Sequence, residues 1–461
     1  MFCEYQRDES RVQLIIYHLG WTSKRCKPVL LNGIAAEIKS LIKHKCKEMD
    51  WRFWIWLFSP TMFIRRCDPA LYRRSKGVEM LVKTFKYRLY PSKPQARLLE
   101  QTVETCRRWY NLCLEERKTA WESEQRSISK YDQLAKVKMY RKENPFASQL
   151  HSHILQVVTA DIDKAFQAFF RRVKAGEKAG YPRFKGNNRF DSFGLKEYGN
   201  EFKLDGRRLR LTGIGRVRVR WHRPLEGTIK TVRICRQAGE WYACFACEVQ
   251  EKPLEPTGRE VGIDVGLYHL LATSENEVVD NPRWYREEQK NLRVIQRQVS
   301  RRKPGGANRR KSVLALQRFH AHIANSRKDY LDKLVYRFIS IYDHIALEDL
   351  QISGMVRNHH LSKSILDAGW GYLKKRLIDK AVEAGRQVYL VNPTFTSRTC
   401  CSCGMVFPDL SLKDRWIECQ CGLSMDRDVN AARNILLRAG HARWGKSTTI
   451  GLGLPQEAPQ L

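Results

Sequence analysis

Three acidic residues stand at the ends of stretches whose neighbours are mostly apolar. They are Asp264, Glu348 and one of the pair Asp426 and Asp428. A carboxylate is costly to bury unless a cation or hydrogen bonds compensate its charge. Several carboxylates that converge on two divalent cations about 4 Å apart can hydrolyse a phosphodiester, because one cation activates water and the other stabilises the leaving oxygen. Taken together, the three acids indicate a nuclease site that holds two Mg²⁺.

Each acid also has an ordinary structural explanation. Asp264 and Gly266 could form an ordinary Asp-x-Gly turn at the end of a strand, although Gly266 would also let a phosphate backbone approach closely. Glu348 is preferred over the adjacent Asp349, because neighbouring residues of a strand point to opposite faces and Glu348 is in phase with Ala346.

The third acid lies where a helix is expected to begin. Asp426 and Asp428 both occur there, and Asn430 follows. Aspartate and asparagine are common helix caps, so one of these acids could serve only as a cap. The residues alone leave the choice between Asp426 and Asp428 open.

A cysteine cluster precedes that helix. Cys400 and Cys403 form a C-x₂-C pair, Cys419 and Cys421 form a C-x-C pair, and fifteen residues separate the pairs. Four thiolates at such a spacing can close a tetrahedral site on one structural Zn²⁺. Cys401 is expected to be a bystander, and a redox dithiol is the alternative. A second pair, Cys244 and Cys247, falls in an expected strand and would face opposite sides, so both are predicted to be core residues.

The composition indicates an anionic partner. Lys and Arg number 83 against 49 Asp and Glu, which gives a formal net charge of +34 at pH 7, while 43% of the residues are hydrophobic. This is a folded, strongly cationic chain, and phosphate backbones are the usual partner because their neutralisation releases counterions. A ribosome-associated or membrane-surface protein is the alternative. Two basic runs lie close together in the sequence, Arg301–Lys303 and Arg309–Lys311. They could belong to a solvated loop, but we favour contacts with a nucleic-acid backbone.

The longest early apolar run, Phe53–Phe58, is far shorter than the roughly twenty residues that span a bilayer, and the first residues lack a signal-peptide core. We expect no membrane segment, and the cysteine pattern suits a reducing cytosol.

Hydrophobic periodicity predicts two kinds of region. Residues 80–258 should begin with a strand, continue with long helices and end in short strands with alternating arginines. Residues 259–437 should alternate strands and helices, which implies an α/β sheet. The expected elements are strand 81–90, helices from 92 and over 148–173, strands within 192–249, a linker at 251–258, strand 261–273, two helices within 285–340 broken at 303–306, strand 341–347, helix 368–384, strand 387–391 and helix 429–438.

Seven short stretches, in this order, resemble the TnpB nucleases of bacterial insertion sequences, relatives of the type V CRISPR effectors. They are Phe85–Pro91, Tyr181–Lys185, Gly262–Gly266, Leu347–Leu350, Asp367–Trp370, Thr396–Cys400 and Asp426–Ala432. The likeness extends from Leu81 to about Ala439. It implies that Asp264, Glu348 and Asp428 are the three catalytic acids, and it is the reason for preferring Asp428 over Asp426.

The resemblance also implies the fold and the partners. We expect an α/β nuclease domain of RuvC-like RNase H fold over 259–437, with an inserted zinc ribbon at about 396–425. An α+β recognition lobe, a wedge β-barrel plus a helical part, would occupy 80–258. A guide RNA from the transposon end would pair with double-stranded target DNA beside a short flanking motif, and the one site would cut both strands. The chain would act in the cytoplasm, associated with the nucleoid.

Two functional alternatives remain: an RNA-guided repressor without cleavage, and a transposase that joins DNA ends. A structural RNA-binding protein would have no use for the three acids. Residues 1–79 depart from the resemblance, and we favour Met80 as the true start over an accessory nucleic-acid-binding segment. A helix is possible near 33–46. Residues 438–461 are expected to form a flexible tail.

Overall fold

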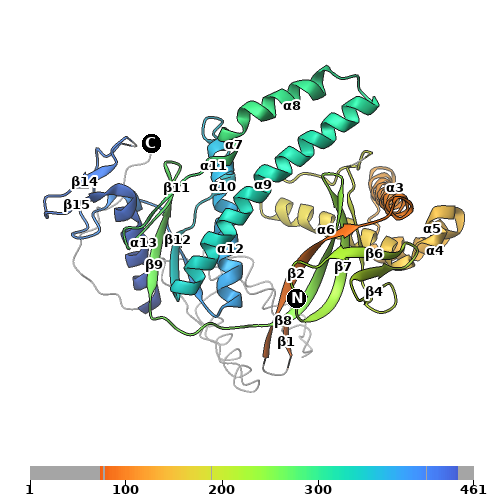
Figure 1. Cartoon of the computed structure of the whole chain (residues 1–461), viewed down its shortest axis with the longest axis horizontal. Helices are drawn as coiled ribbons and strands as arrows, with labels where there is room; N and C mark the ends of the chain where they lie inside the picture. The colour runs from red at the N-terminus through yellow and green to blue at the C-terminus, as the bar shows by residue number, and fades with distance from the viewer. Residues whose placement is uncertain (1–72, 76–77, 188, 412, 445–461) are drawn as a thin grey trace, which may run out of the picture. The chain divides into compact units, whose positions relative to one another are not determined.

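The computed structural model describes residues 73–75, 78–187, 189–411 and 413–444. The possible helix near 33–46 and most of the segment 1–79 lie outside the described residues. Figure 1 shows that the described chain contains two large sheets with separate sets of helices. No helix within the described ranges is both long and apolar enough to cross a bilayer.

The first sheet has eight strands and runs in the order β3-β7-β8-β2-β6-β5-β4, with β1 paired to β2. Its strands are β1 (Arg73–Ser75), β2 (Val78–Tyr90), β3 (Ser192–Leu195), β4 (Phe202–Asp205), β5 (Arg208–Leu211), β6 (Gly215–Arg220), β7 (Thr228–Gln237) and β8 (Glu240–Gln250). Within the described residues β3 and β4 end the sheet without pairing to each other. The predicted wedge β-barrel is therefore only partly closed, because its two edge strands do not meet.

Four helices accompany this sheet: α3 (Lys93–Glu124), α4 (Lys130–Glu143), α5 (Pro145–Gln149) and α6 (Ser152–Lys174). The start of α3 follows from local sequence. The Ser92 hydroxyl accepts from the Gln95 amide, and the Gln95 side chain accepts from the Ser92 amide, a reciprocal cap with Pro94 in the first turn. The buried face of α6, including Ile154, Val158 and Ile162, lies in the same core as the sheet, as its periodicity predicted.

Cys244 and Cys247 occupy β8 as predicted. Cys247 lies on the buried face, as predicted, but the prediction of a core position is wrong for Cys244, which is half-buried on the other face, with its Sγ 3.8 Å from Sγ of Cys235. Neither belongs to a metal-binding cluster in the part of the chain that the structure describes.

The second sheet has five strands in the order β11-β10-β9-β12-β13. Its strands are β9 (Glu260–Val265), β10 (His269–Thr273), β11 (Val278–Asp280), β12 (His344–Glu348) and β13 (Gln387–Val391). The first three form antiparallel pairs, whereas β12 is parallel to both β9 and β13. The prediction of an α/β sheet is confirmed. The predicted single strand 261–273 is a hairpin, because Gly266 and its neighbours turn the chain back.

The helices linked to this sheet are α7 (Trp284–Glu287), α8 (Gln289–Arg301), α9 (Ala307–Ile341), α10 (Ile352–Met355), α11 (Ser362–Ala368), α12 (Trp370–Glu383) and α13 (Arg427–Trp444). A short ribbon of β14 (Trp416–Glu418) and β15 (Ser424–Asp426) precedes α13. The tail predicted from residue 438 is wrong in its first part, because α13 continues to Trp444.

The two faces of the second sheet carry different helices. Val261 and Ile263 of β9 share a core with α9 and α12. On the opposite face Ala346 of β12 packs against Ile435 and Ala439 of α13. Since successive strand residues alternate between faces, Gly262 and Asp264 face α13.

Gly262 permits the close approach of α13 to β9. A β-carbon at this position would lie 2.1 Å from the Ala432 carbonyl oxygen and 2.8 Å from the Leu436 amide nitrogen. Such contacts are impossible, so any larger residue would force the helix away from the strand. Gly262 is thus what lets the acid at the start of α13 reach the sheet.

Gly262→Ala should destabilise the chain by about 3 kcal/mol or more, because overpacking here moves backbone rather than a flexible side chain. Denaturant unfolding would measure the change. Gly440→Ala is the matched control in α13, where an added β-carbon meets no atom within 4 Å. It should be neutral or slightly stabilising. Equal effects of the two substitutions would contradict the packing argument.

Candidate active site

Asp264 and Glu348 lie side by side at the carboxyl ends of two parallel strands. Ile263 of β9 is in register with Leu347 of β12, so the next residue on each strand is an acid. Glu348 is in phase with Ala346 and faces α13, as predicted. Asp349 points elsewhere and pairs with Lys374 at 2.5 Å.

The start of α13 separates the roles of its two acids. Oδ1 of Asp426 accepts from the amides of Asp428 and Val429, at 2.8 and 3.1 Å, so Asp426 caps the helix. Asp428 makes no such cap. Its Oδ2 lies 3.9 Å from the place where a β-carbon of Gly266 would stand, directly after the strand that carries Asp264.

The charges of Glu348 and Asp428 both act on Asp264. Burial, followed by the charges of Glu348 and Asp428, raises the pKa of Asp264 well above its usual value. Burial also raises the pKa of Glu348 and of Asp428. Partly buried acids that repel each other are destabilising when ionised, and a bound cation relieves that cost.

Asp264→Asn should therefore raise the melting temperature of the chain when no magnesium is added. A carboxyl whose pKa is higher in the folded state costs stability once the pH exceeds its unfolded value of about 4. The cost grows as pH rises toward the folded pKa, so the gain from Asn should be larger at pH 8 than at pH 5. We expect a gain of roughly 2 °C or more at pH 8, measured by scanning calorimetry. A shift of the same size at both pH values would show that ionisation of Asp264 is not the cause.

One arginine pairs with Asp428. The Arg415 guanidinium is 3.6 Å from Oδ1 of Asp428 and stacks over the Tyr268 ring at 5.0 Å. The charges of Arg415 and His269 lower the pKa of Asp428 against the larger effect of its burial. Neither residue was among those predicted from the sequence, since a lone arginine or histidine carries no spacing signal.

The four predicted zinc ligands come together. Their sulfur atoms all lie within 4.8 Å of one another, with 3.7 Å between Cys400 and Cys421 and 3.5 Å between Cys403 and Cys419. Zn–S bonds of about 2.3 Å in a tetrahedron place sulfurs about 3.8 Å apart, so the cluster fits zinc. Cys401 stays outside it, with its Sγ 3.8 Å from Sδ of Met425.

Two buried asparagines of α13 fasten the base of the cysteine loop. Asn434 donates to the carbonyls of Thr396 and Thr399 at 2.9 and 2.6 Å. Asn430 donates to Thr399 at 2.7 Å and accepts from the Cys401 amide at 2.8 Å. Asn430 is therefore not a helix cap, which was one of the possibilities left open by the sequence.

The same loop reaches the second acid. The Thr396 hydroxyl donates to Oε1 of Glu348. The Arg438 charge lowers the pKa of Glu348 against the effect of burial, and Arg438 also donates to the carbonyls of Asn392 and Thr394. The cysteine loop thus touches Glu348 directly. This contact was not predicted from the sequence, where Thr396 appeared only as the first residue of the stretch Thr396–Cys400, which resembles the family.

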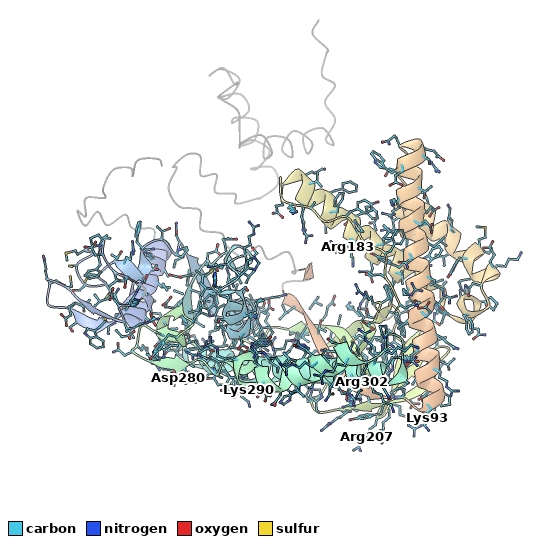
Figure 2. The ribbon with its side chains drawn as sticks, turned by 90° about the horizontal axis from the view of Figure 1, so that it is seen from above. Lys93, Arg183, Arg207, Asp280, Lys290 and Arg302 are labelled. Atoms are coloured by element: carbon cyan, nitrogen blue, oxygen red, sulfur yellow. The ribbon has the colours of Figure 1, made fainter. Side chains whose placement is uncertain are left out.

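The basic runs between α8 and α9 have mixed roles. Arg302 donates to the Asn308 carbonyl at 2.8 Å and Arg309 to the Val299 carbonyl at 3.3 Å, so both brace the turn between the helices. Figure 2 shows Lys290 and Arg302 at opposite ends of α8. Arg301 and Lys303 remain exposed and available to phosphates.

Three family models match the chain. They are described as "Probable transposase" over residues 244–359, "Cas12f1-like, TNB domain" over 370–435 and "Helix-turn-helix domain" over 80–126. Within the last range the structure has strand β2 and the long helix α3. The first two ranges cover the second sheet, the cysteine cluster and the first half of α13.

Two relatives match most of the chain. A "Putative RNA-guided DNA endonuclease" of Streptomyces pristinaespiralis is 36% identical over 367 residues, which is 78% of this chain and 90% of the relative. "Putative RNA-guided DNA endonuclease InsQ" of Escherichia coli (strain K12) is 31% identical over 404 residues, or 82% and 98%. Among solved structures, a Cas12f1–sgRNA–target DNA complex has a TM-score of 0.48 at 14% identity, covering 77% of this chain and 98% of that one. The sequence relatives establish that this chain belongs to the TnpB family, as the sequence predicted.

Proposed function

We propose that this chain is an RNA-guided endonuclease that cuts double-stranded DNA at the site formed by Asp264, Glu348 and Asp428. The observation that carries the proposal is the convergence of acids from β9, β12 and α13, each with a raised pKa, on one face of the sheet. Three antiparallel strands followed by two parallel ones, with acids at the strand ends, suit a RuvC-like RNase H fold.

The donor set fits two Mg²⁺, because carboxylate oxygens are the ligands that this hard cation takes. When bound, the two ions would activate water and stabilise the leaving oxygen of the phosphodiester. Asp264, Glu348 and Asp428 would supply the carboxylate oxygens, and the charges of Glu348 and Asp428 both act on the Asp264 carboxyl. Thr396 orients the Glu348 carboxylate, and the absence of a side chain at Gly266 lets the His269 carbonyl approach beside Asp428.

We assign one structural Zn²⁺ to Cys400, Cys403, Cys419 and Cys421. Four thiolates leave no open position for catalysis, so the ion would serve to hold the loop that reaches Glu348 and α13. This makes the segment at about 396–425 a zinc ribbon inserted in the nuclease part, residues 259–437.

Residues 80–258 would bind the guide RNA and the target duplex. The alternating arginines of β6, Arg216, Arg218 and Arg220, are exposed and can contact phosphates without reading sequence. The guide would come from the transposon end and supply specificity by base pairing, while the chain reads a short flanking motif. A nucleoid-associated location would follow from such DNA binding.

The relatives' names support a nuclease over both alternatives. A guided repressor would not need three acids at one site, and a transposase that joins ends would transfer strands rather than leave free breaks. The deciding experiment is a cleavage assay with the chain, RNA from its own transposon end carrying a redirected guide, and a plasmid library with randomised flanks. Guide-dependent double-strand breaks beside one motif, requiring Mg²⁺, are expected. Binding without breaks would support the repressor instead.

Thr396→Val should lower the cleavage rate about 10- to 100-fold and raise the Mg²⁺ concentration needed for half-maximal rate. A methyl group of valine replaces the threonine hydroxyl that orients Glu348. Loss of a hydrogen bond that orients a metal ligand typically has effects of this size. Thr396→Ser keeps the hydroxyl and should restore the rate to within about threefold. Target binding, measured by gel shift, should be the same for all three chains. Equal rates for the valine and serine variants would show that the hydroxyl has no role.

A further inference from the structure

We propose that His151, His153 and Glu201 form a second transition-metal site, of a kind that takes Zn²⁺, on the part of the chain that carries the first sheet. The site is separate from the three acids and from the four cysteines, and it does not depend on the proposed cleavage. His151 caps α6, His153 lies in its first turn, and Glu201 directly precedes β4. The fold therefore brings the start of a helix and a strand-edge loop to one point.

The ligand atoms have metal-site spacing. One nitrogen or oxygen of each residue lies within 4.8 Å of the others, and in the described residues only the four cysteines form another such cluster. Nδ1 of His151 is 3.2 Å from Oε1 of Glu201, and Nδ1 of His153 approaches the same oxygen. Bonds of about 2.0–2.2 Å to zinc place neighbouring tetrahedral ligands about 3.3 Å apart.

Burial and backbone hydrogen bonds fix the position of the Glu201 carboxylate. The Glu201 side chain is fully buried, and its other oxygen, Oε2, accepts from the Lys196 and Glu197 amides at 2.7 and 3.4 Å. These bonds leave Oε1 directed at the two imidazoles. Hydrogen bonds that fix the orientation of a ligand in this way are typical of metal sites.

The burial of the Glu201 side chain also favours a bound cation. A buried carboxylate is costly without a positive partner. In the described chain its ion-pair partners are the two histidines, which are neutral unless protonated. Two imidazoles and one carboxylate are donors that suit zinc and its first-row neighbours.

The competing explanation is a purely hydrogen-bonded cluster. The His153 amide lies 3.4 Å from Nδ1 of His151, a long contact that metal coordination would replace. Oε1 of the half-exposed Glu197 is 3.5 Å from Nδ1 of His153, so either Glu197 or water could complete the coordination. A bound ion would then tie the start of α6 to the loop before β4.

The test counts zinc in the full-length chain by mass spectrometry after equilibration with Zn²⁺. We expect two zinc ions per chain, and one in the double variant His151→Asn/His153→Gln, in which Asn retains a capping oxygen. His360→Gln, at an exposed histidine elsewhere, should retain two. With Co²⁺, the double variant should keep the near-ultraviolet thiolate absorption and lose the visible bands of the second ion.

A single zinc in the wild-type chain, or the same number in the double variant, would overturn the proposal. A second measurement avoids any folding defect of the variant. In the metal-stripped wild-type chain, zinc added beyond saturation of the thiolate absorption should slow hydrogen exchange at residues 151–156 and 196–201. Unchanged exchange in both segments would equally reject the site.

Discussion

Asp264→Asn should reduce guided DNA cleavage by at least about 1000-fold, which corresponds to about 4 kcal/mol of transition-state stabilisation. Asp264 is the acid whose pKa responds to the charges of both other acids, so its loss would remove a carboxylate from the centre of the proposed cation site. Affinity for the guide and the target should stay within about threefold, because those contacts are made elsewhere. Single-turnover cleavage at saturating Mg²⁺, together with a gel shift, would measure the two quantities separately.

Asp426→Asn is the matched control, two residues from Asp428. The asparagine oxygen can still accept from the amides that Asp426 caps, so the helix start should persist. Cleavage should remain within about tenfold of wild type. If Asp426→Asn were as damaging as Asp264→Asn, the assignment of the third acid would have to move from Asp428 to Asp426.

Cys403→Ser should remove the proposed zinc and lower cleavage at least about 100-fold. Structural zinc contributes on the order of 10 kcal/mol to small metal-dependent folds, so the loop should lose its order without the ion. Thr396 would then no longer hold Glu348, and Arg415 would leave Asp428. Zinc content, limited proteolysis between 400 and 426, and cleavage should all change together.

Cys401→Ser is the control for this substitution. Cys401 is a neighbouring thiol outside the cluster, and its backbone amide, which bonds Asn430, is unaffected by the change. Zinc content and cleavage should stay near wild type. A Cys403→Ser chain that lacks zinc but cleaves normally would show that the ribbon does not support Glu348.

Much of the fold was predictable because its signals are local. Period-two alternation in β2, the serine and proline that open α3, and the apolar runs of β9 and β13 all determine their elements within a few residues. The choice of Glu348 over Asp349 also followed from local alternation. Asp349 instead forms an ion pair with Lys374, which accounts for an acid at that position.

The rest depends on contacts between distant segments. The sequence alone does not show that Gly262 packs against α13, because the helix lies far along the chain. It also does not show that Arg415 contacts Asp428, since that contact forms only in the folded structure. Whether β3 meets β4, and so whether the first sheet closes, depends on sheet curvature that no short pattern encodes. The histidines 151 and 153 gave no signal because Glu201 is distant in sequence.

The late position of α13 also has a consequence for synthesis. The acids of β9 and β12 leave the ribosome before Asp428, by several seconds to a few tens of seconds at about 5–20 residues per second. During that interval a nascent chain carries Asp264 and Glu348 without the third proposed acid. A message broken before the codons of α13 would accordingly yield a chain whose proposed catalytic site is incomplete.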